Sequence, residues 1–174
     1  MGWLTVLAYL VAAGLALALG ARRDRRDLER AFWLVSGVGL LFLAVNKQLD
    51  LQSFLTATGR CAAQVQGWYD RRGAVQVGFI AALAGAAVVG GLGALWVLRG
   101  TVRRTGVALL GLVWITGFVL VRAVGFHHVD ALIGLRLAGM RLNWVFELGG
   151  IAVFVLGCLV ARAAPAPARA RPGR

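Results

Sequence analysis

The polar residues best suited to chemistry gather where three apolar blocks of the chain begin or end. They are Asn46, Lys47, Asp50 and Gln52 after the second block, Arg122, His127, His128 and Asp130 after the fourth, and Arg141, Asn143 and Glu147 at the start of the fifth. Spacings of three or four residues within each group place pairs of these residues on one face of a helix. The pattern predicts one polar site at one end of a helical bundle.

A charge-compensated structural network is the first interpretation of this site. Lys47, Arg122 and Arg141 would pair with Asp50, Asp130 and Glu147 and so lock the helix ends and loops together. Glu147 lies inside the fifth apolar block, where an ionisable group is costly unless it has a partner or faces a cavity. This interpretation predicts folding defects on mutation and no ligand.

A metal site is the second interpretation. His127 or His128, with Asp130, Glu147 and Asp50, would suit zinc, iron or manganese, and an open coordination position would activate water. The chain would then be a metal-dependent membrane enzyme, such as a hydrolase of a lipid-like substrate, with His127, His128 or Glu147 as catalytic groups. Neighbouring histidines point about 100° apart on a helix, so both bind one ion only if the helix ends there. No HExxH spacing supports this site.

Binding of an anionic molecule is the third interpretation, with a lipid headgroup or a partner membrane protein as the ligand. The segments on this side of the predicted bundle carry seven Lys and Arg residues against four acidic residues. Arginine holds phosphate or carboxylate in a bidentate fork. The candidate binding residues are the cations Lys47, Arg60, Arg72, Arg122 and Arg141, together with the polar residues Asn46, Asp50, Gln52 and Asn143.

Several functions are disfavoured by what the chain contains. Ion or proton transport needs polar groups along the membrane depth, and the first and third apolar blocks offer almost none. Haem would need a histidine on a second helix. The two cysteines, Cys61 and Cys158, form no CxxC pattern, so no iron–sulfur cluster is expected, nor is a nucleotide. The basic residues lie between apolar blocks, which points to lipid rather than to nucleic acid.

The elements that must position the site are transmembrane helices. Of 174 residues, 60% are hydrophobic, and they form blocks of 15 to 22 residues, the length that crosses about 30 Å of hydrocarbon. The blocks predict an all-α membrane domain over residues 1–163. Its five expected helices cover residues 3–20, 31–45, 77–98, 107–124 and 144–160.

Residues 48–76 are expected to form an amphipathic helical segment at the membrane interface, above the polar site. Apolar residues recur there at steps of three and four, and Trp68 and Tyr69 suit an interfacial position. A re-entrant hairpin would show the same periodicity. Residues 164–174 are expected to be a disordered basic tail in the cytoplasm.

The distribution of Lys and Arg residues predicts how the chain is oriented in the membrane. Five arginines follow the first block, and the segments expected inside hold twelve Lys and Arg residues against seven outside. The amino terminus is therefore expected outside and the carboxyl terminus in the cytoplasm of a bacterial inner membrane. Two stripes of small residues are expected at close helix contacts. They are Ala8, Ala12, Ala16 and Gly20 in the first helix, and Gly78, Ala82, Ala86, Gly90 and Ala94 in the third.

Four short strings of sequence suggest a family. The strings are NKQLDLQ at residues 46–52, GWY at 67–69, FHHVD at 126–130, and LNW at 142–144 followed by ELGG at 147–150. In these strings the chain resembles small multi-pass proteins of bacterial inner membranes, over most of residues 30–155. The resemblance implies no particular activity. It implies that the polar cluster is the working part of the molecule.

Overall fold

The computed structural model describes residues 2–22, 27–49, 57–59, 61–62, 64–67, 72–124, 136–137 and 140–164. For residues 72–76, 79–80, 83, 121–124, 136–137 and 140–141 it describes the backbone alone. The predicted site residues Asp50, Gln52, Arg60, His127, His128 and Asp130 lie outside them, as does the predicted tail after residue 164.

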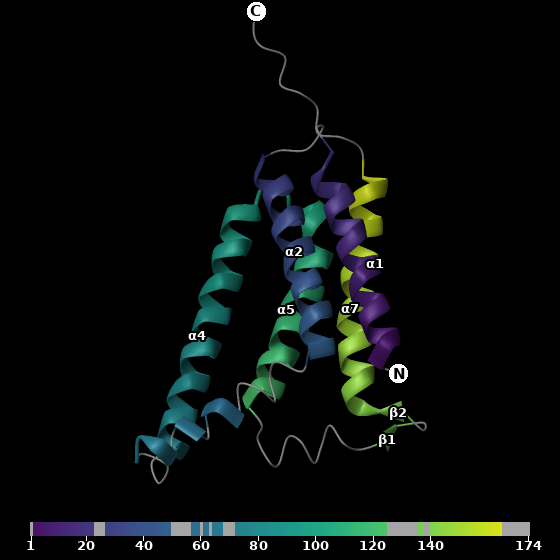
Figure 1. Ribbon diagram of the computed structural model, residues 1–174. Helices are drawn as coiled ribbons and strands as arrows, with labels where there is room; N and C mark the ends of the chain where they lie inside the picture. Colours follow the sequence, from purple (N-terminus) through teal and green to yellow (C-terminus); the bar gives the residue numbers. More distant parts are fainter. Residues whose placement is uncertain are drawn as a thin grey trace, which may run out of the picture.

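Long antiparallel helices make up most of the described chain (Figure 1). They are α1 (Gly2–Gly20), α2 (Asp27–Leu49), α4 (Arg72–Leu98), α5 (Val102–Val124) and α7 (Leu142–Ala163). A two-stranded antiparallel hairpin, β1 (Arg136–Leu137) and β2 (Met140–Arg141), leads directly into α7. We call the end where α2 finishes and α7 begins the Glu147 end, and the end where α2 and α5 begin the Glu29 end.

Four of the described helical segments are long and apolar enough to cross a membrane. They are Gly2–Gly20, Asp27–Leu49, Val102–Leu120 and Leu142–Ala163. The expected third span, residues 77–98, falls within α4, whose described uninterrupted apolar stretch, Ala84–Leu98, is shorter. The helical class of the fold, with four candidate membrane-spanning helices, is therefore confirmed, while the count of five spans and the interfacial helix stay predictions.

The helices extend beyond the predicted apolar blocks, because charged and polar residues continue them. The start of α2 is Asp27 rather than residue 31, that of α5 is Val102 rather than 107, and that of α4 is Arg72 rather than 77. Hydropathy marks only the part of a helix that sits in hydrocarbon, whereas backbone hydrogen bonding continues into the polar boundary. Residues 72–76, expected in the interfacial segment, thus belong to α4. The described parts of residues 57–67 are helical and mostly exposed, and Gly67 has a positive φ of 71°.

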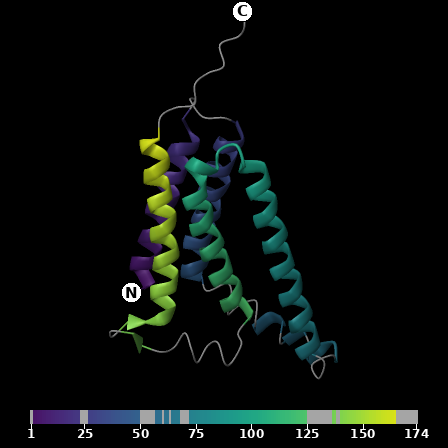
Figure 2. The same ribbon diagram turned by 180° about the vertical axis from the view of Figure 1, so that it is seen from behind.

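A core bundle is formed by α1, α2, α5 and α7 (Figure 2). Its largest fully buried side chains include Trp33, Tyr9, Phe154, Leu40 and Ile115. The aromatic rings of Trp33 on α2 and Phe154 on α7 meet edge to face, with ring centroids 6.3 Å apart. Such packing between helices supplies the dispersion contacts that hold a bundle together in lipid.

Small residues allow the closest helix approaches in the core. Ala12 and Ala16 of the first stripe are fully buried, and a Cβ placed on Gly20 would lie 2.8 Å from the side chain of Leu34. Gly111 of α5 lies against the backbone of Phe154 on α7, and Gly157 of α7 lies against that of Ala108 on α5. The first stripe therefore takes part in the core, and two further glycines set the contact between α5 and α7.

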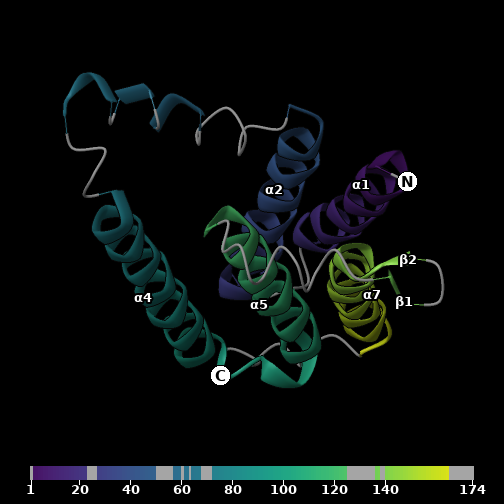
Figure 3. The same cartoon turned by 90° about the horizontal axis from the view of Figure 1, so that it is seen from below.

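Helix α4 stands apart from the core and contacts mainly α5 (Figure 3). Apolar side chains along it are exposed, including Val88, Val89 and Leu92, and a Cβ on Gly78 or Gly90 would meet open space. The glycines of the second stripe thus make no close contact with the described helices, and Ala94 is partly buried. An exposed apolar helix is stable in lipid, because acyl chains are as apolar as its own side chains.

Candidate functional site

An ion pair between Lys47 and Glu147 closes the Glu147 end of the core bundle. Lys47 Nζ donates to Glu147 Oε2 at 2.7 Å, and the hydroxyl of Tyr9 donates to Oε1 of the same carboxylate at 3.2 Å. The side chain of Glu147 is 4% exposed and that of Lys47 19% exposed. One carboxylate thereby joins the last turn of α2, the first half of α1 and the second turn of α7.

The burial of Glu147 follows from its position on the core face of α7. Gly150, Ile151 and Phe154 lie three, four and seven residues further along and are buried as well, so Glu147 continues their stripe. An unpaired carboxylate would be very costly at this depth, and Lys47 offsets that cost. Lys47 also sits in the last turn of α2, where a cation interacts favourably with the helix dipole.

The hydroxyl of Tyr9 is expected to stabilise the fold measurably. Tyr9→Phe should lower the free energy of unfolding by about 1.5 kcal/mol, since it removes one hydrogen bond to a buried charged group. Denaturation of the detergent-solubilised protein by an ionic detergent would measure this loss. In a Glu147→Met background the same change should cost less, because the hydrogen bond to the Glu147 carboxylate is already absent. An equal loss in both backgrounds would show that Tyr9 acts through packing.

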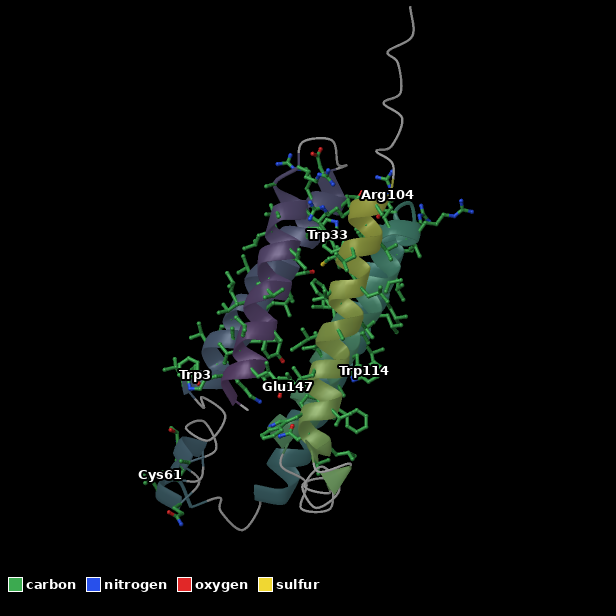
Figure 4. The ribbon with its side chains drawn as sticks, turned by 90° about the vertical axis from the view of Figure 1, so that its right-hand side faces the viewer. Trp3, Trp33, Cys61, Arg104, Trp114 and Glu147 are labelled. Atoms are coloured by element: carbon green, nitrogen blue, oxygen red, sulfur yellow. The ribbon has the colours of Figure 1, made fainter. Side chains whose placement is uncertain are left out.

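The structure brings only some of the predicted site residues together. Lys47 and Glu147 are in contact, while Asn46 and Asn143 are partly buried at the same end of the bundle. Arg141 closes the hairpin before α7, Arg122 lies in the last turn of α5, and Arg72 opens the detached helix α4. All these positions lie at one end of the molecule. Figure 4 shows Glu147 there, with Trp33 and Arg104 at the other end.

Metal binding gains no support from the part of the chain that the structure describes. Within it, no three His, Cys, Asp or Glu residues are grouped in a way that could hold an ion. Both oxygens of Glu147 are already engaged, one by Lys47 and one by Tyr9. The metal site at His127, His128 and Asp130 lies outside the described residues and stays a prediction.

The hairpin before α7 places two arginines in register. Arg136 of β1 is the strand partner of Arg141 of β2, and Leu142 begins α7 immediately afterwards. Like charges at opposite positions of an antiparallel pair are destabilising by themselves. The first turn of α7 contains no acidic residue, so the positive end of the α7 dipole is not neutralised there and adds to the positive potential of the two arginines. This arrangement favours a negatively charged group close by.

A second buried carboxylate, Glu29, lies at the opposite end and is not one of the predicted site residues. It is 0% exposed, its Oε1 accepts from Trp33 Nε1 at 3.5 Å, and its Oε2 lies 3.8 Å from Nη1 of Arg104 on α5. The prediction starts the second helix at residue 31 and so leaves Glu29 in an arginine-rich loop. The signal was present: Glu29 precedes Trp33, Ser36 and Leu40 at steps of three and four residues, and all four are buried on one face.

The fold and these two ion pairs define the class of the chain: a helical protein with four candidate membrane-spanning helices and a charged residue pair at each end of its core. Comparison of the chain with protein-family models, with curated proteins and with solved structures gives no match. The resemblance to small bacterial inner-membrane proteins, the bacterial origin and the orientation of the termini therefore stay predictions.

Proposed function

We propose that this chain is a multi-pass membrane protein that binds the anionic headgroup of a phospholipid at its Glu147 end. The observation that carries the proposal is the register pair of Arg136 and Arg141 directly before the start of α7. Two cations at opposite strand positions gain most from an anion that both can share. The adjoining helix start offers backbone N–H groups to the same anion.

The Lys47–Glu147 pair supports this function in two ways. It neutralises a carboxylate in the second turn of α7, so that this carboxylate does not compete for the arginines of the hairpin. It also fixes the ends of α2 and α7 relative to each other, which gives the hairpin a rigid base. A preorganised site loses less entropy when a ligand binds.

A lipid is favoured over a soluble anion by the depth of the site. The hairpin directly precedes α7, a helix that is apolar enough to span a membrane. With α7 in the bilayer, the backbone at Arg136 and Arg141 would lie close to the level of the phosphate groups. Lipid headgroups are present there at high local concentration. The predicted binding residues Lys47, Arg122, Arg141 and Asn143 come from helices or strands that end at this level.

Lipid binding to the full chain tests the proposal. We expect Arg136→Gln/Arg141→Gln to weaken binding of phosphatidylglycerol at least about tenfold, the effect of losing about 1.4 kcal/mol of charge-assisted hydrogen bonding. Native mass spectrometry of the detergent-solubilised protein, titrated with phosphatidylglycerol or phosphatidylcholine, would measure it.

The matched control is Arg22→Gln/Arg162→Gln, which removes the same charge from two exposed arginines at the Glu29 end. This control should bind phosphatidylglycerol at the Glu147 end as the unmodified protein does. Circular dichroism should show that both variants are folded. Unchanged phosphatidylglycerol binding by a folded Arg136→Gln/Arg141→Gln variant would refute the proposed function.

A further inference from the structure

A pocket of about 320 Å³ lies at the Glu29 end, remote from the site discussed above. It is bounded by the turn between α4 and α5, by the first turn of α5 and by the start of α2. The polar side chains that line it belong to Glu29, Arg99, Thr101, Arg103 and Arg104. Its volume is at the lower end of the roughly 300–1,000 Å³ typical of small-molecule sites.

The charges that line this pocket are unbalanced. Among the residues that the structure describes, three guanidinium groups line the pocket and one carboxylate does, that of Glu29. That carboxylate is fully buried and lies 3.8 Å from Arg104, so it offsets the arginine nearest the core. Arg99 and Arg103 have exposed side chains on the rim, and their charges are left for a ligand.

The rim of the pocket is held in place by its own contacts. The guanidinium of Arg99 lies 5.2 Å from the ring centroid of Trp96, an arrangement that orients the arginine by a cation–π interaction. The hydroxyl of Thr101 donates to the Leu98 carbonyl at 3.1 Å, and the Thr101 carbonyl accepts from the backbone N–H groups of Arg104 and Thr105. The turn is therefore ordered before any ligand arrives.

The start of α5 adds to the positive field of the pocket. The helix has 23 residues and no acidic residue in its first turn, so the partial positive charge of its dipole is not neutralised locally. Val102 and Arg103, in that first turn, line the pocket. Helix dipole, two rim arginines and an already compensated Glu29 all favour a compact group with more than one negative oxygen.

We propose that this pocket binds a phosphate group, which Arg99 and Arg103 hold from the rim while Arg104 stays paired with Glu29. The phosphate can be that of a phospholipid headgroup in the adjacent leaflet or of a soluble phosphate compound. The pocket lies where α4 and α5 reach the polar boundary, and basic pockets at this depth between membrane helices suit anionic headgroups. This site shares no residue with the one at the Glu147 end.

The test compares Arg99→Gln/Arg103→Gln with Arg22→Gln/Arg162→Gln in the full chain. Both double variants remove the same charge from exposed arginines at the Glu29 end, and only the first alters the pocket. Three probes are titrated separately: inorganic phosphate, phosphatidylglycerol in nanodiscs and phosphatidylcholine in nanodiscs. Binding is followed by native mass spectrometry for the lipids and by the shift in thermal unfolding for phosphate.

Both double variants are made in an Arg136→Gln/Arg141→Gln background, which removes the lipid site at the Glu147 end. In that background we expect the pocket variant to bind phosphatidylglycerol at least about tenfold more weakly than the control variant does, with phosphatidylcholine unaffected. A loss confined to phosphatidylglycerol identifies a lipid headgroup as the ligand, and a parallel loss of the stabilisation by inorganic phosphate identifies a soluble phosphate. Equal binding of every probe by the two variants overturns the proposal. The shared background separates the two ends, because Arg136→Gln/Arg141→Gln by itself removes lipid bound at the Glu147 end and leaves the pocket unchanged.

Discussion

Lys47→Met is expected to lower the free energy of unfolding by about 3–5 kcal/mol, the usual cost of removing one partner of a buried ion pair. The change leaves the carboxylate of Glu147, which is 4% exposed, with the hydroxyl of Tyr9 as its remaining partner among the contacts described above. Glu147→Gln should cost less, because the side chain of Lys47 is 19% exposed and can extend towards water. Unfolding in an ionic detergent, followed by circular dichroism, would measure both losses.

The double variant Lys47→Met/Glu147→Met is the decisive control. It replaces the ion pair by apolar side chains of similar length, and such replacements are often neutral or stabilising. We therefore expect the double variant to be more stable than Lys47→Met alone. If the two single losses simply added in the double variant, the two residues would not act as a pair, contrary to the 2.7 Å contact between them.

Gly111→Ala and Gly157→Ala are expected to force α5 and α7 apart. The added Cβ would lie 2.7 Å from Phe154 Cα in the first variant and 2.5 Å from Ala108 Cα in the second, and neither backbone can yield without moving a helix. Overpacking of this kind costs about 1–3 kcal/mol, and here it acts against backbone rather than against flexible side chains. The free energy of unfolding in detergent should fall accordingly.

Gly117→Ala is the matched control on the same helix. A Cβ on Gly117 meets nothing within 4 Å, so it brings no clash. The change should leave stability unchanged or raise it by up to about 1 kcal/mol, because alanine is the better helix former. Equal destabilisation by Gly111→Ala and Gly117→Ala would mean that α5 and α7 do not approach each other as closely as the structure shows.

The alternating course of the helices and the end of the bundle that collects polar residues could be predicted from the sequence. Apolar blocks of membrane-spanning length leave few alternatives to antiparallel helices, and charges accumulate at their ends. Lys47 and Glu147 stand out because each is an ionisable residue beside or within such a block. Their direct pairing needed the structure, because several cations were equally plausible partners for Glu147.

Tyr9 and Glu29 show why the rest of the charged framework could not be predicted. Tyr9 lies in an apolar block, where a tyrosine is unremarkable, and its role depends on the neighbour that its hydroxyl meets. Glu29 lies among arginines at a helix start, a place where acidic residues are common whether buried or exposed. The partner of Glu29, Arg104, is distant in sequence, so spacing gives no sign of the contact.

The separation of α4 has a similar physical reason. Its stripe of small residues looks like that of α1, yet only the stripe of α1 is packed in the core. In lipid, leaving an apolar face uncovered costs little, so hydropathy predicts that a helix spans the membrane without predicting its neighbours. The pattern of small residues along α4 is equally compatible with a helix packed in the core and with a helix exposed to lipid.

Helix α2 is fastened near both of its ends, to different neighbours. Glu29 contacts Arg104 of α5, and Lys47 contacts Glu147 of α7, at positions about 27 Å apart along the axis at 1.5 Å per residue. An axial slip of α2 by one helical turn, about 5.4 Å, would separate both ion pairs at once. Rotation of α2 about its own axis would do the same. The core bundle therefore resists the sliding and rocking by which many membrane proteins alternate between states, and any ligand meets a scaffold whose register is already set.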